Sequence, residues 1–264
     1  MKRATLRLLN LYLLILSSQL VSQAQSPFTP RSIRTSPRPA APLLYRLTVL
    51  ARAGNPAPGV ESNAYFAFDS PMIADDGTVA FIATLSSDES EALRTGIFTA
   101  GGLHGGRLVA LAGQPAPGLE ETTFQSFGRP SINTAGQVTF FARLSGSSAG
   151  IFLDDALIAS LNGPVPTRAD AQFVALSDPA VNENGLVAFS AAYRNADSTF
   201  GGGAFTQEGP LASDADPIPE LPGVTILSQG NILWLGDTSI AFVAGLSDDS
   251  LGLIADGHLR MHTG

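Results

Sequence analysis

The stretch Ser131–Leu144, SINTAGQVTFFARL, decides the fold because similar versions of this segment, here called the phrase, occur several times in the chain. MIADDGTVAFIATL begins at Met72, AVNENGLVAFSAAY begins at Ala180, and a degenerate fourth version, LGDTSIAFVAGL, begins at Leu235. The shared phenylalanine recurs after 59, 49 and 53 residues, at Phe81, Phe140, Phe189 and Phe242. Periods of this size, with loops of variable length, indicate a solenoid, a propeller or another array of repeats.

The first three copies of the phrase begin with a proline, at Pro71, Pro130 and Pro179, and every copy continues through a turn and ends in a strand. The turn glycines (Gly77, Gly136 and Gly185) stand where the chain needs a positive φ, which glycine adopts without a Cβ clash. Asn133 and Asn182 can hydrogen-bond their own backbone in the turn. The alternation after the turn has period two, which predicts a strand.

Both faces of this strand are nearly free of charge, with Arg143 as the exception. In the first copy one face carries the large residues Val79, Phe81 and Leu85, and the other carries Ala80, Ile82 and Thr84. A strand of this kind is covered on both sides, so we expect the large face of one sheet to pack on the small face of the next. Propeller blades stack in this way.

Other strands complete each copy. The segments TGIF, AGIF, GGAF and LGLI end the copies, and Pro-x-Pro segments such as Ala112–Gly118 lie between them. The sequence therefore predicts an all-β, propeller-like fold of about four blades, each with about four antiparallel strands. The repeat domain spans residues 45–264, with repeats at about 45–106, 107–156, 157–208 and 209–256 and the start of a fifth at 257–264.

The pattern AGxPAPG, then PxINxxGxVAF, then GIF resembles the bacterial NxxGxVAF tandem-repeat proteins, which carry varied cell-surface anchors. The form around Asp76 is also similar to propeller repeats of the TolB type. The resemblance covers residues 45–264; it is specific for the first two copies and weak for the fourth. It implies an exported, propeller-like protein and no established catalytic activity, so no functional residues carry over.

The amino-terminal residues are arranged like a targeting signal. Residues 1–24 combine a basic start, a short interrupted apolar run and small residues before Gln25. This order is typical of a secretory signal peptide, whereas a membrane anchor needs a longer apolar run. Residues 25–44 hold five prolines and three arginines without periodicity, which predicts an extended linker. We therefore expect an extracytoplasmic protein, in the periplasm, on the cell surface or secreted, without a stable membrane span after cleavage.

The charge and the absence of cysteine limit the classes of binding partner and functional site that the chain can have. All 23 acidic residues follow residue 60, whereas only nine of the 15 basic residues follow the linker. An acidic body repels nucleic acid, so none is expected as a partner. The absence of cysteine removes disulfides, thiolate metal sites and cysteine nucleophiles. The expected partner is an envelope polysaccharide, an envelope protein or a second copy of the chain.

Self-association is suggested by the two ends of the repeat domain. Tyr45–Gly54 and Gly257–Gly264 both match the strand at Arg107–Gly113, which gives one strand more than a closed ring of four blades needs. Either the spare strand overlaps at the seam or the ring is incomplete. We expect the incomplete ring, whose uncovered apolar face favours self-association.

The sequence motifs that could indicate a catalytic or metal site are poorly supported by their context. GSSAG at Gly146–Gly150 matches the G-x-S-x-G nucleophile elbow, but Ser148 lies between two expected strands rather than before a helix. His258 and His262 are four residues apart without a third ligand nearby, and His104 lies in the glycine-rich loop Gly101–Gly106.

The remaining candidates are acidic pairs and one aromatic residue. The pairs Asp75/Asp76, Asp154/Asp155 and Asp248/Asp249 fall in turns, where a structural role is favoured. Ser213–Glu220 has an acidic start, but proline interrupts it as a calcium loop. Trp234, the only tryptophan, is expected in the core.

We nominate no catalytic, cofactor or metal residue. The sequence predicts an exported, non-catalytic binding or scaffold module, and the alternative is a carbohydrate-active enzyme on a propeller.

Overall fold

The computed structural model describes residues 47–87 and 90–263, so the expected signal peptide and linker lie outside the described residues. The described chain forms four antiparallel sheets. The first sheet contains β1 (Asn63–Ile73), β2 (Thr78–Ser87), β3 (Ser90–Gly101) and β4 (Arg107–Leu111). The second contains β5 (Phe124–Phe127), β6 (Ser131–Ile132), β7 (Val138–Leu144), β8 (Ser148–Leu153) and β9 (Ala156–Ser160).

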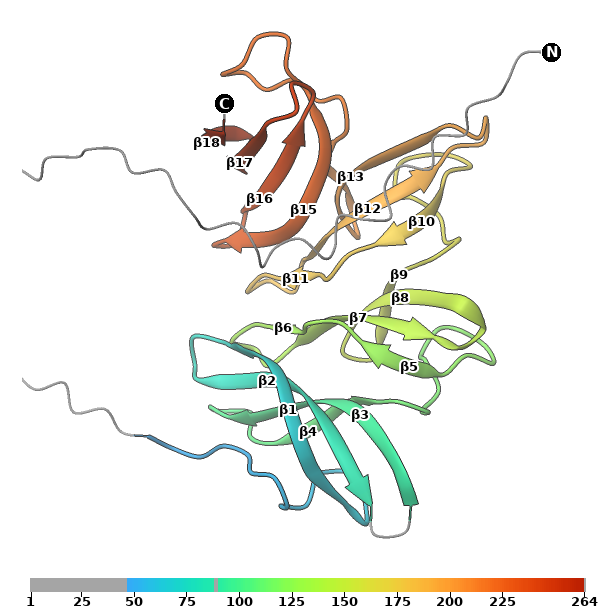
Figure 1. Cartoon of the computed structure of the whole chain (residues 1–264), viewed down its shortest axis with the longest axis vertical. Helices are drawn as coiled ribbons and strands as arrows, with labels where there is room; N and C mark the ends of the chain where they lie inside the picture. The colour runs from blue at the N-terminus through green and yellow to red at the C-terminus, as the bar shows by residue number, and fades with distance from the viewer. Residues whose placement is uncertain (1–46, 88–89, 264) are drawn as a thin grey trace, which may run out of the picture. The chain divides into compact units, whose positions relative to one another are not determined.

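The third and fourth sheets repeat this order. The third contains β10 (Gln172–Leu176), β11 (Ala180–Val181), β12 (Val187–Arg194), β13 (Phe200–Thr206) and β14 (Gly209–Ser213). The fourth contains β15 (Ile226–Leu235), β16 (Ser239–Leu246), β17 (Leu251–Ala255) and β18 (His258–Thr263). Figure 1 shows the sheets following one another from the first, in blue-green, to the fourth, in red. The predicted all-β, propeller-like class is confirmed, with four or five strands per sheet and no sheet closed on itself.

The repeat boundaries differ from those expected. β4 pairs with β3 and therefore completes the first sheet instead of opening the second copy. β18 likewise pairs with β17 as the fourth strand of the fourth sheet, so residues 257–264 do not begin a fifth copy. The segment at residues 47–54 forms no strand, and the spare strand inferred from its sequence is absent from the described chain. A hydrophobic pattern locates a strand but does not tell on which side it finds its partner.

The turn chemistry follows the sequence. Gly77, Gly136 and Gly185 have φ angles of 84°, 76° and 81°. Oδ1 of Asn182 accepts hydrogen bonds from the backbone N–H groups of Asn184 and Leu186, at 3.1 and 2.8 Å. These residue types therefore close the turn as their conformational preferences predict.

The shared phenylalanines form the core, as predicted. Their exposed fractions are 5%, 0%, 1% and 3% for Phe81, Phe140, Phe189 and Phe242. Each is paired across two strands with an equivalent residue, as Phe140 is with Phe152. The two rings stack with centroids 5.5 Å apart, and Phe124 meets Phe152 edge to face at 5.1 Å.

The large face of each sheet packs on the small face of the preceding one. Phe140 and Phe152 of the second sheet share a core cluster with Ala80 and Ile97 of the first. Corresponding clusters join the second sheet to the third and the third to the fourth. The large face of the first sheet has a cluster of its own, which contains Phe81 and Phe98. Burial between consecutive sheets is therefore the main stabilising contact of the fold.

Polar side chains reinforce the stack at the end of the sheets where the glycine turns lie, here called the turn end. Nδ2 of the buried Asn133 donates to the carbonyl of Asn182 in the next sheet, at 2.9 Å. Nδ2 of Asn182 donates in turn to the carbonyl of Asp237, at 2.7 Å. Arg107 reaches from the first sheet to the carbonyl of Gly136, at 2.9 Å. Each of the two asparagines thus forms hydrogen bonds within its own turn and to the next sheet.

Candidate functional site

The residues singled out in the sequence are dispersed and have structural contacts. Ser148 begins β8 directly after the 3-10 turn Ser145–Ser147, in a hairpin rather than a strand-to-helix elbow. The three histidines lie beside three different carboxylates: His104 near Asp76, His258 near Glu220 and His262 near Asp248. Within residues 47–87 and 90–263, no group of three metal-ligating side chains occurs.

The other candidates also contribute to the fold. Asp76 accepts hydrogen bonds from the backbone and the hydroxyl of Thr78, and these bonds lower the pKa of its carboxyl. Trp234 packs between the third and fourth sheets, as the core interpretation expects, and its Nε1 donates to the carbonyl of Ala180 at 3.0 Å. The described part of the chain contains no helix of the length and apolarity that a membrane span requires.

The end opposite the turns, here called the hairpin end, contains a more informative site. It lies between the third and fourth sheets, and residues of β10, β12 and β15 line it. The pocket has a volume of about 310 Å³ and is lined in part by Asp214, Gln229, Ser190 and Ser228. None of these residues was proposed as a site residue from the sequence, where Asp214 was considered only as part of the segment Ser213–Glu220 and Ser190 only as part of the repeated phrase.

Comparison of the three sheet interfaces shows what is unusual here. Ile82 and Phe127 pack against the same core cluster in the first interface, and Phe141 and Leu176 do so in the second. Phe127, Leu176 and Gln229 occupy one structural position, because they pair with Ala142, Ala191 and Ala244 of their sheets. In the third interface the equivalent pair is Ser190 and Gln229. Polar groups thus replace an apolar contact at one interface only of the three.

Asp214 also replaces an apolar residue. One backbone hydrogen bond recurs in the first three sheets. In the first sheet the N–H of Ala112 donates to the carbonyl of Thr95, and in the second the N–H of Leu161 donates to the carbonyl of Ala149. In the third sheet the N–H of Asp214 donates to the carbonyl of Gly202. These equivalent bonds place Asp214 where the other sheets have alanine and leucine.

Gly202 makes room for this carboxylate. A Cβ on Gly202 would lie 2.5 Å from Oδ2 of Asp214, closer than two such atoms can approach. The positions equivalent to Gly202 hold Thr95 and Ala149, which stand opposite apolar residues. The glycine and the aspartate are therefore a matched pair that builds the pocket.

Two polar atoms of the site are poorly satisfied. Oδ1 of Asp214 and Nε2 of Gln229 are buried and form no hydrogen bond of good geometry among the described residues, although the Gln229 amide lies close enough to the carboxyl to lower its pKa. Burial is the largest influence on the pKa of the Asp214 carboxyl and raises it, while Gln229 and the Gly202 backbone oppose the shift. A buried acceptor and a buried donor without a hydrogen bond of good geometry are costly for the fold.

The hydroxyls around the pocket are held in place. The Ser190 hydroxyl donates to the carbonyl of Gly230 at 2.5 Å and so joins the third sheet to the fourth. Oγ of Ser177 accepts from the backbone N–H of Ser190 at 2.9 Å. The pocket wall is thereby fixed by one contact within the third sheet and one that crosses to the fourth.

A second hollow adjoins the first. It has a volume of about 510 Å³, lies between the second and third sheets, and includes Gln125, Arg143 and Ser148 among its lining residues. Ala175 and Leu176 of β10 line both hollows. The two hollows are therefore neighbours across one strand at the hairpin end.

A second carboxyl with a raised pKa lies outside these linings. Burial raises the pKa of Asp178, and the neighbouring Arg129 opposes the shift. Its carboxylate lies against Gly128 of the second sheet, where a Cβ would overlap it. Asp178 therefore belongs to the packing of the second and third sheets rather than to the pocket of Asp214.

The signal that could have located the site was present in the sequence. Aligning the copies residue by residue would have shown serine at Ser190 and glutamine at Gln229 in place of larger apolar residues. The sequence interpretation weighed the segment around Asp214 only as a calcium loop. Its pairing with Gly202, 12 residues earlier, depends on strand register and is visible only in the structure.

The Asp214→Asn substitution is expected to stabilise the protein by about 1 kcal/mol at pH 7, since it removes a half-buried, incompletely satisfied carboxylate. A raised pKa means that the contribution of Asp214 to stability is complete below its unfolded-state pKa and is lost as the pH rises through the folded-state pKa. The advantage of the variant should therefore shrink as the pH falls from 7 towards 4, measured by urea denaturation. Asp155→Asn, at an exposed turn, is the control, and an equal gain in both variants would contradict the argument.

The fold and the site define an all-β protein of stacked antiparallel sheets, with a pocket between two of them whose largely apolar lining includes a few polar side chains. The chain belongs to a family of unknown function, DUF7453, whose match spans residues 45–247.

Two further comparisons complete this assignment. No curated protein sequence matches significantly. Among solved structures, an acylaminoacyl peptidase from Pyrococcus horikoshii is similar over 74% of this chain, with 13% identity and a TM-score of 0.40. The chain spans about a third of the length of that peptidase, since 32% of it is covered.

Proposed function

We propose that this protein is an exported, non-catalytic binding module of the cell envelope or the extracellular space, and that its ligand is a hydroxyl-rich polymer such as an envelope polysaccharide. Export is supported by the signal-like order of residues 1–24 and by the resemblance to the NxxGxVAF proteins. Binding is supported by the pocket between the third and fourth sheets.

The observation that carries the proposal is the buried polar pair inside the pocket. Oδ1 of Asp214 is an acceptor and Nε2 of Gln229 is a donor, and neither forms a hydrogen bond of good geometry among the described residues. A hydroxyl group is both donor and acceptor, so a sugar can satisfy both atoms through one hydroxyl or two neighbouring ones. The apolar side chains of Leu176 and Leu227 in the same lining suit the C–H surfaces of a sugar ring. The volume is at the lower end of the range of about 300–1,000 Å³ for ligand pockets, which suits a single sugar unit.

The adjoining hollow supports a polymer rather than a free monosaccharide. Because both hollows share Ala175 and Leu176, one extended chain can occupy them in succession. Gln125, Arg143 and Ser148 supply donors and acceptors in the second hollow. Arg143 also offers a positive charge to an acidic sugar in an otherwise acidic body.

Binding is preferred to glycoside hydrolysis because of the number of carboxylates. A glycosidase of the usual kind needs two carboxyl groups that face each other across the scissile bond, about 5–10 Å apart. Asp214 is the one carboxylate in the linings of the two hollows. A single carboxylate with a raised pKa suits a hydrogen-bonding role to a ligand hydroxyl.

The test is a binding screen of the purified chain against neutral and acidic bacterial polysaccharides, followed by calorimetry on the best ligand. The chain should be taken from the secreted fraction, where its amino terminus is expected near Gln25. Asp214→Ala, which installs the alanine of the first sheet, is expected to weaken binding by about tenfold to a hundredfold, the value of a hydrogen bond to a charged group.

The matched control is Asp155→Ala, which removes a carboxylate from an exposed turn outside both hollows and should leave affinity unchanged. Loss of affinity in both variants would point to general charge rather than to the pocket. A polysaccharide that binds equally well to Asp214→Ala and to the unaltered chain would refute the proposed site. Ligand cleavage during the assay would favour the enzyme alternative.

A further inference from the structure

Two sheet faces in this chain have the composition of an interface but no sheet packed on them among the described residues. The front face is the large face of the first sheet, formed by residues such as Phe68, Ile73 and Phe81. The back face is the small face of the fourth sheet, formed by residues such as Val243 and Leu253. Three of the described core clusters join consecutive sheets and one belongs to the first sheet, and none of them joins the fourth sheet to the first.

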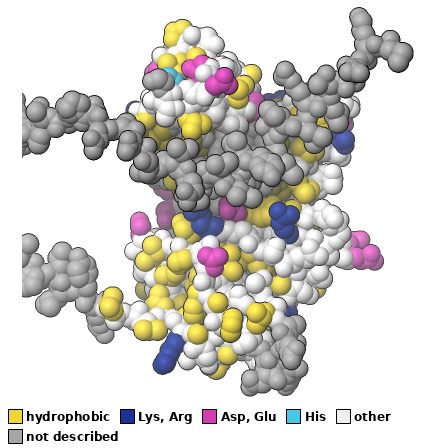
Figure 2. Space-filling view, in the orientation of Figure 1, with side chains coloured by type: hydrophobic (Ala, Val, Ile, Leu, Met, Phe, Trp, Pro, Cys, Tyr) yellow, Lys and Arg dark blue, Asp and Glu magenta, His cyan; other side chains and the backbone are white. Residues whose placement is uncertain are grey.

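The front face is exposed where its equivalents are covered. Phe68 is 43% exposed, whereas Phe127 and Leu176, at the same position of the next two sheets, are partly buried against the preceding sheet. Ile73 on the same face is 70% exposed. Figure 2 shows hydrophobic side chains gathered over the first sheet.

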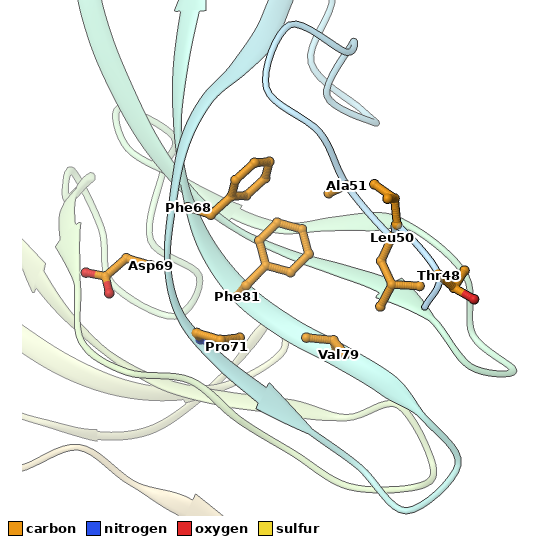
Figure 3. A pocket seen from close by; sticks show the side chains of 9 residues that line it. Thr48, Leu50, Ala51, Phe68, Asp69, Pro71, Val79 and Phe81 are labelled. Atoms are coloured by element: carbon orange, nitrogen blue, oxygen red, sulfur yellow. The ribbon is translucent and has the colours of Figure 1, made fainter. Parts of the chain in front are cut away.

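A hollow of about 450 Å³ lies on this face. Figure 3 shows Phe68 and Phe81 directed into it from β1 and β2, with Leu50 and Ala51 opposite and Asp69 turned away. The lining is predominantly apolar. It therefore has the character of a sheet interface from which the partner is missing.

The back face is the counterpart. In the first three sheets the small-face residues Ala80, Thr139 and Ala188 are fully buried by the following sheet. On the fourth sheet the equivalent Ala241 is 9% exposed, but on the same face Val243 is 49% exposed, whereas Ser190 at its position in the third sheet is 7% exposed, and Leu251 is 52% exposed. The outward positions of β16 and β17 hold Ala241, Val243, Gly245, Leu251, Leu253 and Ala255, without any charge.

We propose that the back face of one copy packs on the front face of a second copy, head to tail, in the manner of the sheet interfaces inside the chain. The internal interfaces are the template, because each joins a large face to a small face. A second copy supplies each uncovered face with the half-interface that it lacks. The contact is heterologous, so that the two partners use different surfaces.

The net charge of the chain gives this association a recognisable salt dependence. With 23 acidic and 15 basic residues, two copies repel each other at long range. The proposed faces are apolar, so salt screens the repulsion without weakening the contact. Association is therefore expected to strengthen as the salt concentration rises, contrary to an interface made of ion pairs.

The test uses light scattering and sedimentation of the full chain with two single substitutions. Ile73→Glu puts a charge on the front face, and Val243→Glu puts one on the back face, both at exposed positions that should leave the fold intact. Each variant alone is expected to associate at least tenfold more weakly than the unaltered chain. An equimolar mixture is expected to form a heterodimer, since one variant keeps an intact back face and the other an intact front face.

Phe200→Glu is the matched control, because Phe200 is 71% exposed at the tip of the β12–β13 hairpin and lies on neither face. It should associate like the unaltered chain, and thermal unfolding should confirm that all three variants remain folded. A chain that stays monomeric at every concentration and salt would overturn the proposal, including the case in which its own residues 1–46 cover the front face. Association that survives both substitutions, or a mixture that stays monomeric, would also overturn it. None of these outcomes depends on whether the pocket of Asp214 binds a polysaccharide.

Discussion

The Phe140→Ala substitution should lower the free energy of unfolding by about 3–5 kcal/mol, the range for emptying a large aromatic site in a core. The ring of Phe140 is fully buried in the second sheet. It stacks on Phe152 at 5.5 Å, meets Phe124 at 6.0 Å and packs against Ala80 and Ile97 of the preceding sheet. The residues around it belong to paired strands, so they cannot close the cavity without breaking strand pairing.

Urea denaturation followed by circular dichroism measures this loss. Phe200→Ala is the control, since it deletes the same ring from a position that is 71% exposed, and a change within about 0.5 kcal/mol is expected. Equal effects of the two substitutions would mean that the core does not lie between the first and second sheets.

The Gly203→Val substitution is expected to cost about 3 kcal/mol, because it overpacks a position that has no space for a side chain. A Cβ on Gly203 would lie 2.5 Å from the carbonyl oxygen of Ala212 and 3.2 Å from the ring of Phe205. The backbone oxygen belongs to the neighbouring strand β14 and cannot move without disturbing the pairing. Gly96 and Gly150 face the same two kinds of neighbour in their sheets, which explains why a glycine precedes each I-F or A-F pair.

Gly106→Val is the matched control for this second prediction. A Cβ added at Gly106 would lie 3.5 Å from the nearest atom, the carbonyl oxygen of Thr99, which is an ordinary contact distance. The φ of Gly106 lies outside the left-handed region. Thermal unfolding should show a large fall in the midpoint for Gly203→Val and a small one for Gly106→Val. A small effect at both positions would contradict the register of β13 against β14.

The strands and turns of the repeated phrase could be predicted from the sequence because their physical causes are local. The alternation after Gly136 fixes which residues share a face, and this places Phe140 in the core without knowledge of any neighbour. The positive φ of Gly136 follows from the turn it occupies. The stacking of large on small faces followed from the absence of charge on both sides of the strand.

The partner of each strand and the location of the pocket could not be predicted, because they depend on register between segments far apart. The sequence of Arg107–Leu111 predicts an apolar strand but does not tell whether the strand joins the first sheet or the second. Only its pairing with β3 assigns it to the first sheet. Asp214 reads as a loop carboxylate until its backbone bond to Gly202 shows that it replaces an alanine or a leucine. The unpartnered Gln229 becomes significant only when it is aligned with Phe127 and Leu176.

The strand order within each sheet has a consequence for how the protein reaches its folded state. In every sheet the main strands are hydrogen-bonded in chain order, without a crossover, and no described strand pairs with a sheet far along the chain. Contacts of short sequence separation give a low contact order, which favours rapid folding. The first sheet can therefore form as soon as its own residues are available, while the fourth is still unfolded. Each finished sheet would then present the surface on which the next one condenses.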